Sequence, residues 1–257
     1  GTVYSLSAYQ IPMGSRTARG VPIVQMLPIP RDEKVTSIVT VSEFTDDEYL
    51  VMLTKGGCIK KTNLSAFANI RSNGLRAIAL GEGDRLRWVR RARVDDSVII
   101  GSALGMGIHF RTDDKQLRPL GRNTRGVKAM KLAKGDELIS MDILPSSVVE
   151  YIADIDEDEE LDVELEEEEL EEYEDEYDED EYDGEEEEEE DRDWGPWVLV
   201  ITNRGYGKRV PVSQFTLQNR AGKGRIATKF KKKNRGAEDR MAALRIVNEE
   251  DRSEEHT

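Results

Sequence analysis

The chain has 257 residues, enough for one large domain or two small ones with a buried core, and its formal net charge at pH 7 is −16. No segment approaches the roughly 20 apolar residues that a membrane-spanning helix needs, and the N-terminus lacks the pattern of a signal peptide, so we expect no membrane partner. Cys58 is the only cysteine, which excludes an internal disulfide framework and fits a reducing compartment.

Positive and negative charge are segregated along the chain. Residues 151–193 hold 30 Asp/Glu and one Arg, whereas the rest holds 36 Lys/Arg against 23 Asp/Glu. We therefore divide the chain into repeats at 1–150, an acidic low-complexity insertion at 151–193, and a further repeat with the start of the next at 194–257. Because the basic and acidic parts are separate objects, the net charge does not exclude nucleic acid as a ligand. We expect the chain to be a piece of a longer polypeptide.

Four similar units follow one another in the basic part. In each, a glycine-containing turn leads into a strand-like stretch, a basic or polar patch, and a corner that contains Arg or Lys and ends in Gly. The corner glycines are Gly20, Gly74, Gly126 and Gly224, spaced by 54, 52 and 98 residues, and the last spacing becomes 55 without the 43 residues of the insertion. A regular period of this size indicates an array of supersecondary units.

Short β-strands separated by glycine turns are expected in every unit. Apolar stretches from Tyr49 to Thr54, from Val98 to Ile100 and from Val198 to Thr202 each run toward a glycine turn. About four short strands per unit, without helical periodicity, predict an all-β, propeller-like array of four-stranded blades. We interpret the glycine pairs as hairpin turns and not as phosphate-binding loops, because none continues as a P-loop or into a GxGxxG helix.

The sequence contains no catalytic constellation. His109 and His256 are the only histidines, so the residues needed for a His-containing catalytic triad or a histidine metal site are almost absent. We expect His109 to be a strand residue. Cys58 is close to two lysines that favour a reactive thiolate, but a small residue beside a turn explains it more simply. We therefore expect no catalytic residue, no metal site and no cofactor in this chain.

Positive charge recurs at equivalent places in successive units. If the units stack around an axis, these places fall on one rim, where Lys and Arg neutralise phosphates without reading sequence. We predict DNA-binding residues after the hairpin turns at Lys60, Lys61, Arg111, Lys208 and Arg209. We predict others at the corners, at Arg16, Arg19, Arg71, Arg122, Arg125, Arg220 and Lys223.

Several segments resemble one known family, in matching order and period: SRTARGVPIVQMLPI from Ser15, GGCIKKTNLSAF from Gly56, GRNTRGVKAMKL from Gly121 and NRGYGKRVPVSQF from Asn203. Outside the acidic insertion, nearly the whole chain is similar to the C-terminal DNA-wrapping domain of DNA gyrase A. The resemblance implies a β-pinwheel, a propeller-like disc whose blades exchange strands. It also implies that double-stranded DNA is bent around the basic rim with positive handedness, which supports negative supercoiling by a type II topoisomerase.

The resemblance places the chemistry outside this chain. It implies a cleaving tyrosine in the N-terminal part of gyrase A, ATP and Mg bound by gyrase B and other domains, and an assembly of gyrase A with gyrase B as a heterotetramer. The implied location is the bacterial cytoplasm, with the chromosome, or an organelle of bacterial descent.

Two alternatives stay open. The diagnostic gyrase heptapeptide, QRRGGKG, is matched at five of seven positions by Gln218 to Gly224, but in a late unit and not in the first. The C-terminal domain of the corresponding topoisomerase IV polypeptide is therefore one alternative. The other is a propeller-type protein-interaction module, although such a module does not need Arg or Lys at every corner.

The acidic run at 151–193 is expected to be a disordered loop between blades, because like charges repel and almost nothing in it can be buried. We further hypothesise that this tethered polyanion competes with DNA for the basic rim, since a short tether gives an effective concentration on the order of millimolar.

Overall fold

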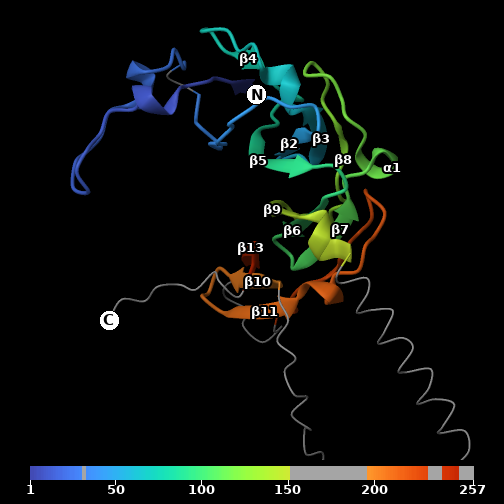
Figure 1. Ribbon diagram of the computed structural model, residues 1–257. Coiled ribbons are helices and arrows are strands. Elements are labelled where there is room, and N and C mark those ends of the chain that lie inside the picture. Colours follow the sequence, from blue (N-terminus) through green and yellow to red (C-terminus); the bar gives the residue numbers. More distant parts are fainter. Residues whose placement is uncertain (31–32, 151–195, 231–238, 249–257) are drawn as a thin grey trace, which may run out of the picture.

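The computed structural model describes residues 1–30, 33–150, 196–230 and 239–248. The acidic insertion, with its predicted disorder, lies outside the described residues. The described residues form four antiparallel sheets arranged in a curved row (Figure 1). The prediction of an all-β array of blades is confirmed.

The first full blade is the four-stranded sheet β5-β2-β3-β8. Its strands are β2 (Glu48–Thr54), β3 (Cys58–Asn63), β5 (Leu86–Arg93) and β8 (Val127–Lys128). β2 and β3 form a hairpin closed at Gly57, whose φ of 85° favours glycine. β2 is rich in apolar residues and is buried along most of its length, as expected for a strand between two packed layers.

The following blades repeat this plan. The sheet β12-β7-β6-β9 contains β6 (Ser97–Ser102), β7 (Met106–Arg111), β9 (Leu138–Leu144) and β12 (Arg225–Ile226). The sheet β11-β10-β13 contains β10 (Trp197–Thr202), β11 (Gly207–Pro211) and β13 (Met241–Val247). The first unit contributes β1 (Thr2–Val3), which pairs with β4 (Leu75–Arg76).

Three of the four described sheets take their outermost strand from a following repeat. β4, β8 and β12 start directly after the corner glycines and pair back onto β1, β3 and β7 in one common register. An alanine closes each exchange: the N–H groups of Ala77, Ala129 and Ala227 donate to the carbonyls of Gly1, Gly57 and Gly105 at 3.0, 2.8 and 2.8 Å. The strand exchange that the family resemblance implied is therefore present.

Short helical turns connect the strands. They are η1 (Ala8–Gln10), η2 (Ile23–Gln25), η3 (Leu64–Phe67), η4 (Val212–Gln214) and α1 (Asp114–Leu117), and residues 146–150 are helical as well. α1 begins after Asp113, whose carboxylate accepts a hydrogen bond of 2.8 Å from the N–H of Gln116 and so caps the first turn.

The hydrophobic core lies between neighbouring blades. Val51 of β2 and Phe110 of β7 belong to one buried cluster, and Ile99 of β6 and Val200 of β10 belong to the next. Leu50, on the opposite face of β2, belongs to a third cluster with the first unit. Because successive strand residues alternate between faces, β2 and β6 each contribute to two clusters and so join neighbouring blades into one stack.

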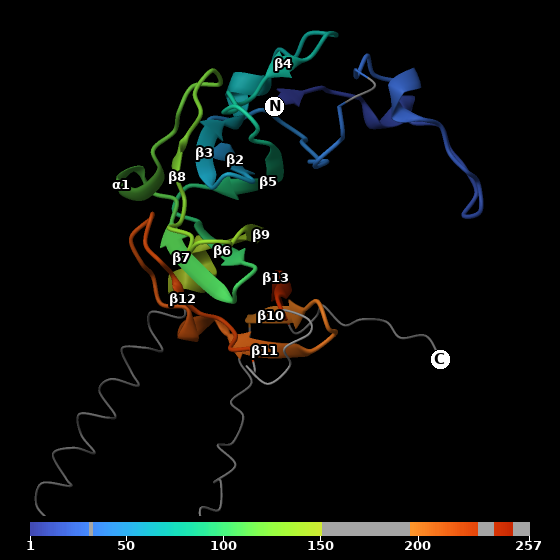
Figure 2. The ribbon, with the colours of Figure 1, turned by 180° about the vertical axis from the view of Figure 1, so that it is seen from behind.

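The stack has two distinct sides. β5, β9 and β13 lie along one side, the inner edge, whereas β8, α1 and β12 lie along the other, the outer edge (Figure 1, Figure 2). The dark blue segment around residues 8–28 projects away on the side of the inner edge. Within the described ranges, no helix has the length and apolar character needed to cross a membrane.

Candidate nucleic-acid interface

Corners of consecutive repeats are hydrogen-bonded to one another through their backbones. The N–H of Ala79 donates to the carbonyl of Thr124 at 3.0 Å, and the N–H of Lys131 donates to the carbonyl of Gly222 at 2.8 Å. We call this set of segments the corner ribbon, which comprises residues 71–80, 121–131 and 219–228. Backbone hydrogen bonds hold the corners at fixed spacing, so side chains at equivalent corner positions recur at regular intervals.

Exposed basic side chains stand on all three corners of the ribbon. Arg71, Arg125 and Lys223 are exposed; Arg125 and Lys223 directly precede a corner glycine with positive φ, and Arg71 lies three residues before one. At Gly126, a Cβ atom would lie 2.4 Å from the carbonyl oxygen of Ile59. Only glycine fits this close approach to the preceding blade, and the tight corner leaves the basic residue beside it at the surface.

Arg16 and Arg19, predicted at the first corner, are exposed but are not brought together with the others. Their loop belongs to the projecting blue segment (Figure 1). A Cβ atom at Gly20 would meet nothing within 4 Å, in contrast to one at Gly126.

Lys60 is buried, and the prediction that it faces a ligand on the rim is wrong. Its side chain has 0% exposure. Its ammonium donates to the carbonyls of Ala77, Arg122 and Thr124 at 2.7, 2.8 and 3.3 Å. Burial, with a smaller contribution from the Arg122 charge, lowers the pKa of Lys60 to about 8. Ala77 belongs to one corner, and Arg122 and Thr124 belong to the next. The ammonium of Lys60 therefore links two successive corners.

Lys61 is buried as well, and its predicted role as a phosphate ligand is corrected in the same way. Its ammonium donates to the carbonyl of Thr112, lies 3.8 Å from the Asp114 carboxylate and stands 4.5 Å from the centre of the Tyr49 ring. Burial lowers the pKa of Lys61, although Asp114 opposes the shift. Three partners hold this cation inside the blade.

Arg220 is half-buried and acts within the ribbon. Its Nε donates to the carbonyl of Gln116 and its Nη1 to the carbonyl of Lys128, both at 2.6 Å. The guanidinium therefore ties one corner to the strand that starts from the preceding corner. Arg122 and Arg111 are half-buried.

Lys208 and Arg209 occupy the hairpin positions that Lys60 and Lys61 occupy in their own blade, yet they are exposed. They lie on β11, onto which no exchanged strand packs among the described residues. Arg209 stacks on Trp197, with 4.8 Å between the guanidinium carbon and the ring centre. Burial at this position thus depends on the neighbouring corner and not on the lysine itself.

Some basic residues of the ribbon were not predicted from the sequence. Arg76, Lys128, Lys131 and Arg225 are exposed on the exchanged strands or directly after them. The repeated position directly after the corner glycine was the available signal, but the strand exchange that exposes these residues depends on contacts with the preceding repeat.

His109 is a buried structural residue. Its Nδ1–H donates to the carbonyl of Phe215 at 2.6 Å, and the Ser97 hydroxyl donates to its Nε2 at 2.7 Å. Burial lowers the pKa of His109, which keeps the ring neutral and both nitrogens satisfied. Cys58 is half-buried. Across the described ranges, no three His, Cys, Asp or Glu side chains gather in an arrangement that could hold a metal ion.

Comparisons with known proteins agree with this architecture. A family described as "DNA gyrase C-terminal domain, beta-propeller" matches residues 1–42, 48–93, 96–145 and 196–236, more than half of the chain. The chain is 59% identical over 251 residues to the DNA gyrase A polypeptide of Synechocystis sp., covering 98% of this chain and 27% of that protein. It is 41% identical over 247 residues to the chloroplastic/mitochondrial DNA gyrase A polypeptide of Arabidopsis thaliana, covering 96% of this chain and 22% of that protein.

Two solved structures share the fold. A DNA gyrase A C-terminal domain matches with a TM-score of 0.62 at 22% identity, covering 97% of this chain and 63% of that one. The C-terminal domain of a DNA topoisomerase IV matches with a TM-score of 0.62 at 20% identity, covering 89% of this chain and 55% of that one. At these identities the likeness shows the fold alone.

Propeller-like blades that exchange strands define a β-pinwheel fold, and the family match and the gyrase A relatives make it a domain of a type II topoisomerase. The chain belongs to the DNA gyrase C-terminal domain family. The names of its relatives favour gyrase A over topoisomerase IV. The chain spans about a quarter of the length of these relatives, and no catalytic domain is evident in its described part.

Proposed function

We propose that this chain binds double-stranded DNA along the corner ribbon and bends it around the outer edge of the blades. The observation that carries the proposal is the placement of Arg71, Arg125 and Lys223 on three corners whose backbones are joined in series. A bent polyanion is held best by cations that recur on each corner of a curved edge, because the phosphates themselves recur along the DNA.

The energetics favour contacts in every repeat. DNA has a persistence length of about 150 bp, so bending 20–30 bp by a large angle costs roughly 1–6 kcal/mol. Phosphate contacts that release counterions offset this cost. The described helical segments are short, with four residues in α1 and five at 146–150, too few to read bases from a groove. We therefore expect the affinity to depend on charge and DNA bendability, with little dependence on sequence.

The basic residues divide into two groups by burial. Lys60 and Arg220 hold the corners from within, and Lys61 is held inside its blade. The proposed phosphate ligands are Arg71, Arg76, Arg125, Lys128, Lys131, Lys223 and Arg225 on the ribbon, with Arg16, Arg19, Arg111, Arg122, Lys208 and Arg209 as further candidates.

We infer that the parent protein is a DNA gyrase A polypeptide that assembles with gyrase B as a heterotetramer and supports negative supercoiling. In this proposal ATP and Mg are bound outside this chain, and the chain itself needs no cofactor. The cyanobacterial and plant-organelle relatives support either the bacterial cytoplasm or an organelle of bacterial descent as the location.

The test is a binding titration against linear duplexes of increasing length at several salt concentrations. We expect the affinity to rise with duplex length until the ribbon is filled, and to fall steeply with added salt. Affinity that is independent of length would contradict wrapping. A complete lack of DNA binding would instead favour the protein-interaction module.

A further inference from the structure

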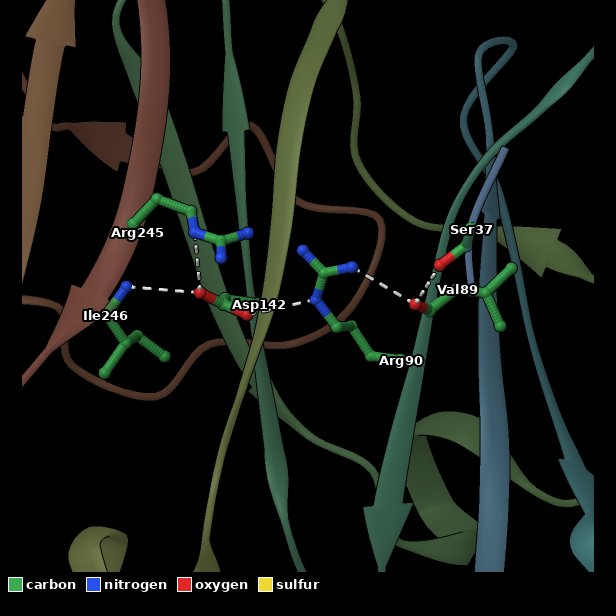
Figure 3. A network of polar contacts seen from close by, with 6 residues as sticks. All are labelled: Ser37, Val89, Arg90, Asp142, Arg245 and Ile246. Carbon is green, nitrogen blue, oxygen red and sulfur yellow. Dashed lines mark hydrogen bonds and ion pairs between the residues drawn. The ribbon is translucent and has the colours of Figure 1, made fainter. Parts of the chain in front are cut away.

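One carboxylate on the inner edge joins three consecutive blades. Asp142 lies on β9, and its Oδ1 accepts a hydrogen bond of 3.2 Å from Nε of Arg90 on β5 (Figure 3). Its Oδ2 lies 3.6 Å from Nε of Arg245 on β13 and accepts a hydrogen bond of 3.3 Å from the N–H of Ile246. The three strands belong to three different sheets, so the group spans two blade boundaries.

The Arg90–Asp142 pair is better shielded from solvent than an ordinary surface ion pair. The side chain of Asp142 is 16% exposed and that of Arg90 is 28% exposed, whereas that of Arg245 is 54% exposed. A second nitrogen of the same guanidinium, Nη1 of Arg90, donates to the carbonyl of Val89. That carbonyl also accepts a hydrogen bond from the Ser37 hydroxyl. The contact therefore links the inner strands to the segment of the first unit that carries Ser37 (Figure 3).

The three charged residues occupy equivalent positions in their blades. Arg90, Asp142 and Arg245 lie opposite Val51, Ile99 and Leu199, respectively. In every blade this pair comes shortly before the register shift at the end of the strand. Along the inner edge, equivalent positions thus carry positive, negative and positive charge, so the sign changes at each blade boundary.

This alternation has a mechanical consequence. The corner ribbon fixes the distance between blades at the outer edge, and Asp142 fixes it at the inner edge. Two fixed edges determine the angle between neighbouring blades. Without the carboxylate, the two guanidinium groups would remain with like charge and no shared partner, which favours opening of the inner edge.

We propose that Asp142 sets the angle between these blades and thereby the path of DNA on the outer edge. It is a positioning residue, on the side opposite the corner ribbon, and not a ligand of DNA. The inference rests on the proposed wrapping function, because only a bent DNA path would register a change in blade angle.

The test compares the 257-residue chain with its Asp142→Asn variant in two DNA assays. In the first, ligase seals nicked circular DNA in the presence of each protein, and the linking difference trapped per bound molecule reports the wrap. In the second, affinity is measured for a duplex of about 20 bp, which is too short to follow several blades. We expect the variant to trap about half of the wild-type linking difference or less, while its short-duplex affinity changes less than about twofold.

Further variants separate positioning from folding. Arg90→Lys keeps the charge and should retain most of the wrap, whereas Arg90→Gln leaves Asp142 only Arg245 as a charged partner and should give a partial loss. Arg87→Gln removes an exposed arginine from the same strand without touching Asp142 and should wrap like the wild type. Thermal unfolding of each protein shows whether it is folded at the assay temperature, and Arg90→Gln replaces Asp142→Asn as the decisive variant if the latter is unfolded.

The outcomes distinguish this inference from the proposed function. A wild-type chain that binds DNA but traps no linking difference would contradict wrapping itself. A wild-type chain that wraps, with a folded Asp142→Asn or Arg90→Gln variant that wraps equally, would overturn the inference alone. Parallel loss of long- and short-duplex affinity in a folded variant would also overturn it, because that pattern indicates a damaged binding surface and not an altered path.

Discussion

Lys60 Nζ donates a hydrogen bond of 2.8 Å to the carbonyl oxygen of Arg122, so that an ammonium in one blade holds the corner of the following repeat. The same ammonium holds Ala77 of the preceding corner at 2.7 Å. Lys60 has the residue type and the repeat position predicted for a phosphate ligand, but backbone carbonyl oxygens accept the hydrogen bonds of its ammonium. The corner ribbon therefore depends on a buried charge beneath it as well as on the exposed charges that it carries.

Substituting Lys60 with methionine is expected to destabilise the fold strongly. Met fills much of the same volume but removes the ammonium donor from the carbonyl oxygens of Ala77 and Arg122, and each orphaned group costs about 1–3 kcal/mol. We expect the free energy of unfolding, measured by urea denaturation, to fall by about 2–4 kcal/mol.

Lys208→Met is the matched control, because Lys208 holds the equivalent hairpin position but is exposed. Its free energy of unfolding should change by less than about 0.5 kcal/mol. Equal effects of the two substitutions would show that the buried hydrogen bonds of Lys60 do not stabilise the corners.

The contrast between Lys60 and Lys208 also shows how far the sequence can be interpreted. Hairpin strands such as Tyr49 to Thr54, and the corner glycines, were predictable because alternation, turn residues and a regular period are local signals. Burial of Lys60 was not predictable, because it arises when the corner of another repeat closes over the hairpin. Asp142 gave no local signal either, since its two arginine partners come from the blades on either side of it.

His109 should make the stability of the domain sensitive to acid. Because burial lowers the pKa of folded His109 below its unfolded value of about 6.5, the unfolded chain binds the proton more readily, and protonation favours unfolding. The stabilisation by neutral His109 is complete above the unfolded pKa and is lost as the pH falls below about 6.5, with a slope of up to about 1.4 kcal/mol per pH unit.

Urea denaturation of the wild type and His109→Gln at several pH values between about 7.5 and 5 measures this contribution. The variant should be less stable at the higher pH, but its stability should fall less on acidification. Parallel pH profiles for the two proteins would exclude His109 as the source, because all other titrating groups are common to both.

Replacement of Gly126 by alanine should weaken the exchanged strand. The φ of 92° disfavours any side chain, and the new Cβ would lie 2.4 Å from the carbonyl oxygen of Ile59. We expect a loss of at least about 2 kcal/mol in the free energy of unfolding. Gly121→Ala is the control, because a Cβ there would meet nothing within 4 Å and φ is not positive. A Gly126→Ala variant as stable as this control would show that the corner can relax.

Neutralising the ribbon should change the salt dependence of DNA binding. Arg125→Gln combined with Lys223→Gln removes two proposed phosphate ligands, so the slope of log affinity against log salt should become shallower by about 1.8. Fluorescence anisotropy with a duplex long enough to contact several blades measures the slope. The control removes two exposed arginines, Arg85 and Arg87, at the start of β5 and should leave the slope unchanged. Equal slopes for all three proteins would exclude these corners from the DNA path.

Deleting the acidic run is expected to strengthen DNA binding. Residues 151–193 lie outside the described residues, and the prediction rests on their 30 Asp/Glu and on their covalent attachment between Glu150 and the blade that begins at Trp197. A tethered polyanion at an effective concentration on the order of millimolar competes with phosphates for the same cations. Replacing the run with a short glycine–serine linker should therefore raise the affinity for a long duplex by about tenfold or more at low salt, with a smaller gain at high salt.

A second variant separates charge from length, because it keeps a linker of 43 residues but replaces the charged residues with Ser and Gly. If this variant binds DNA no better than the wild type, competition by the acidic run is excluded. A gain in affinity equal to that of the deletion assigns the effect to charge.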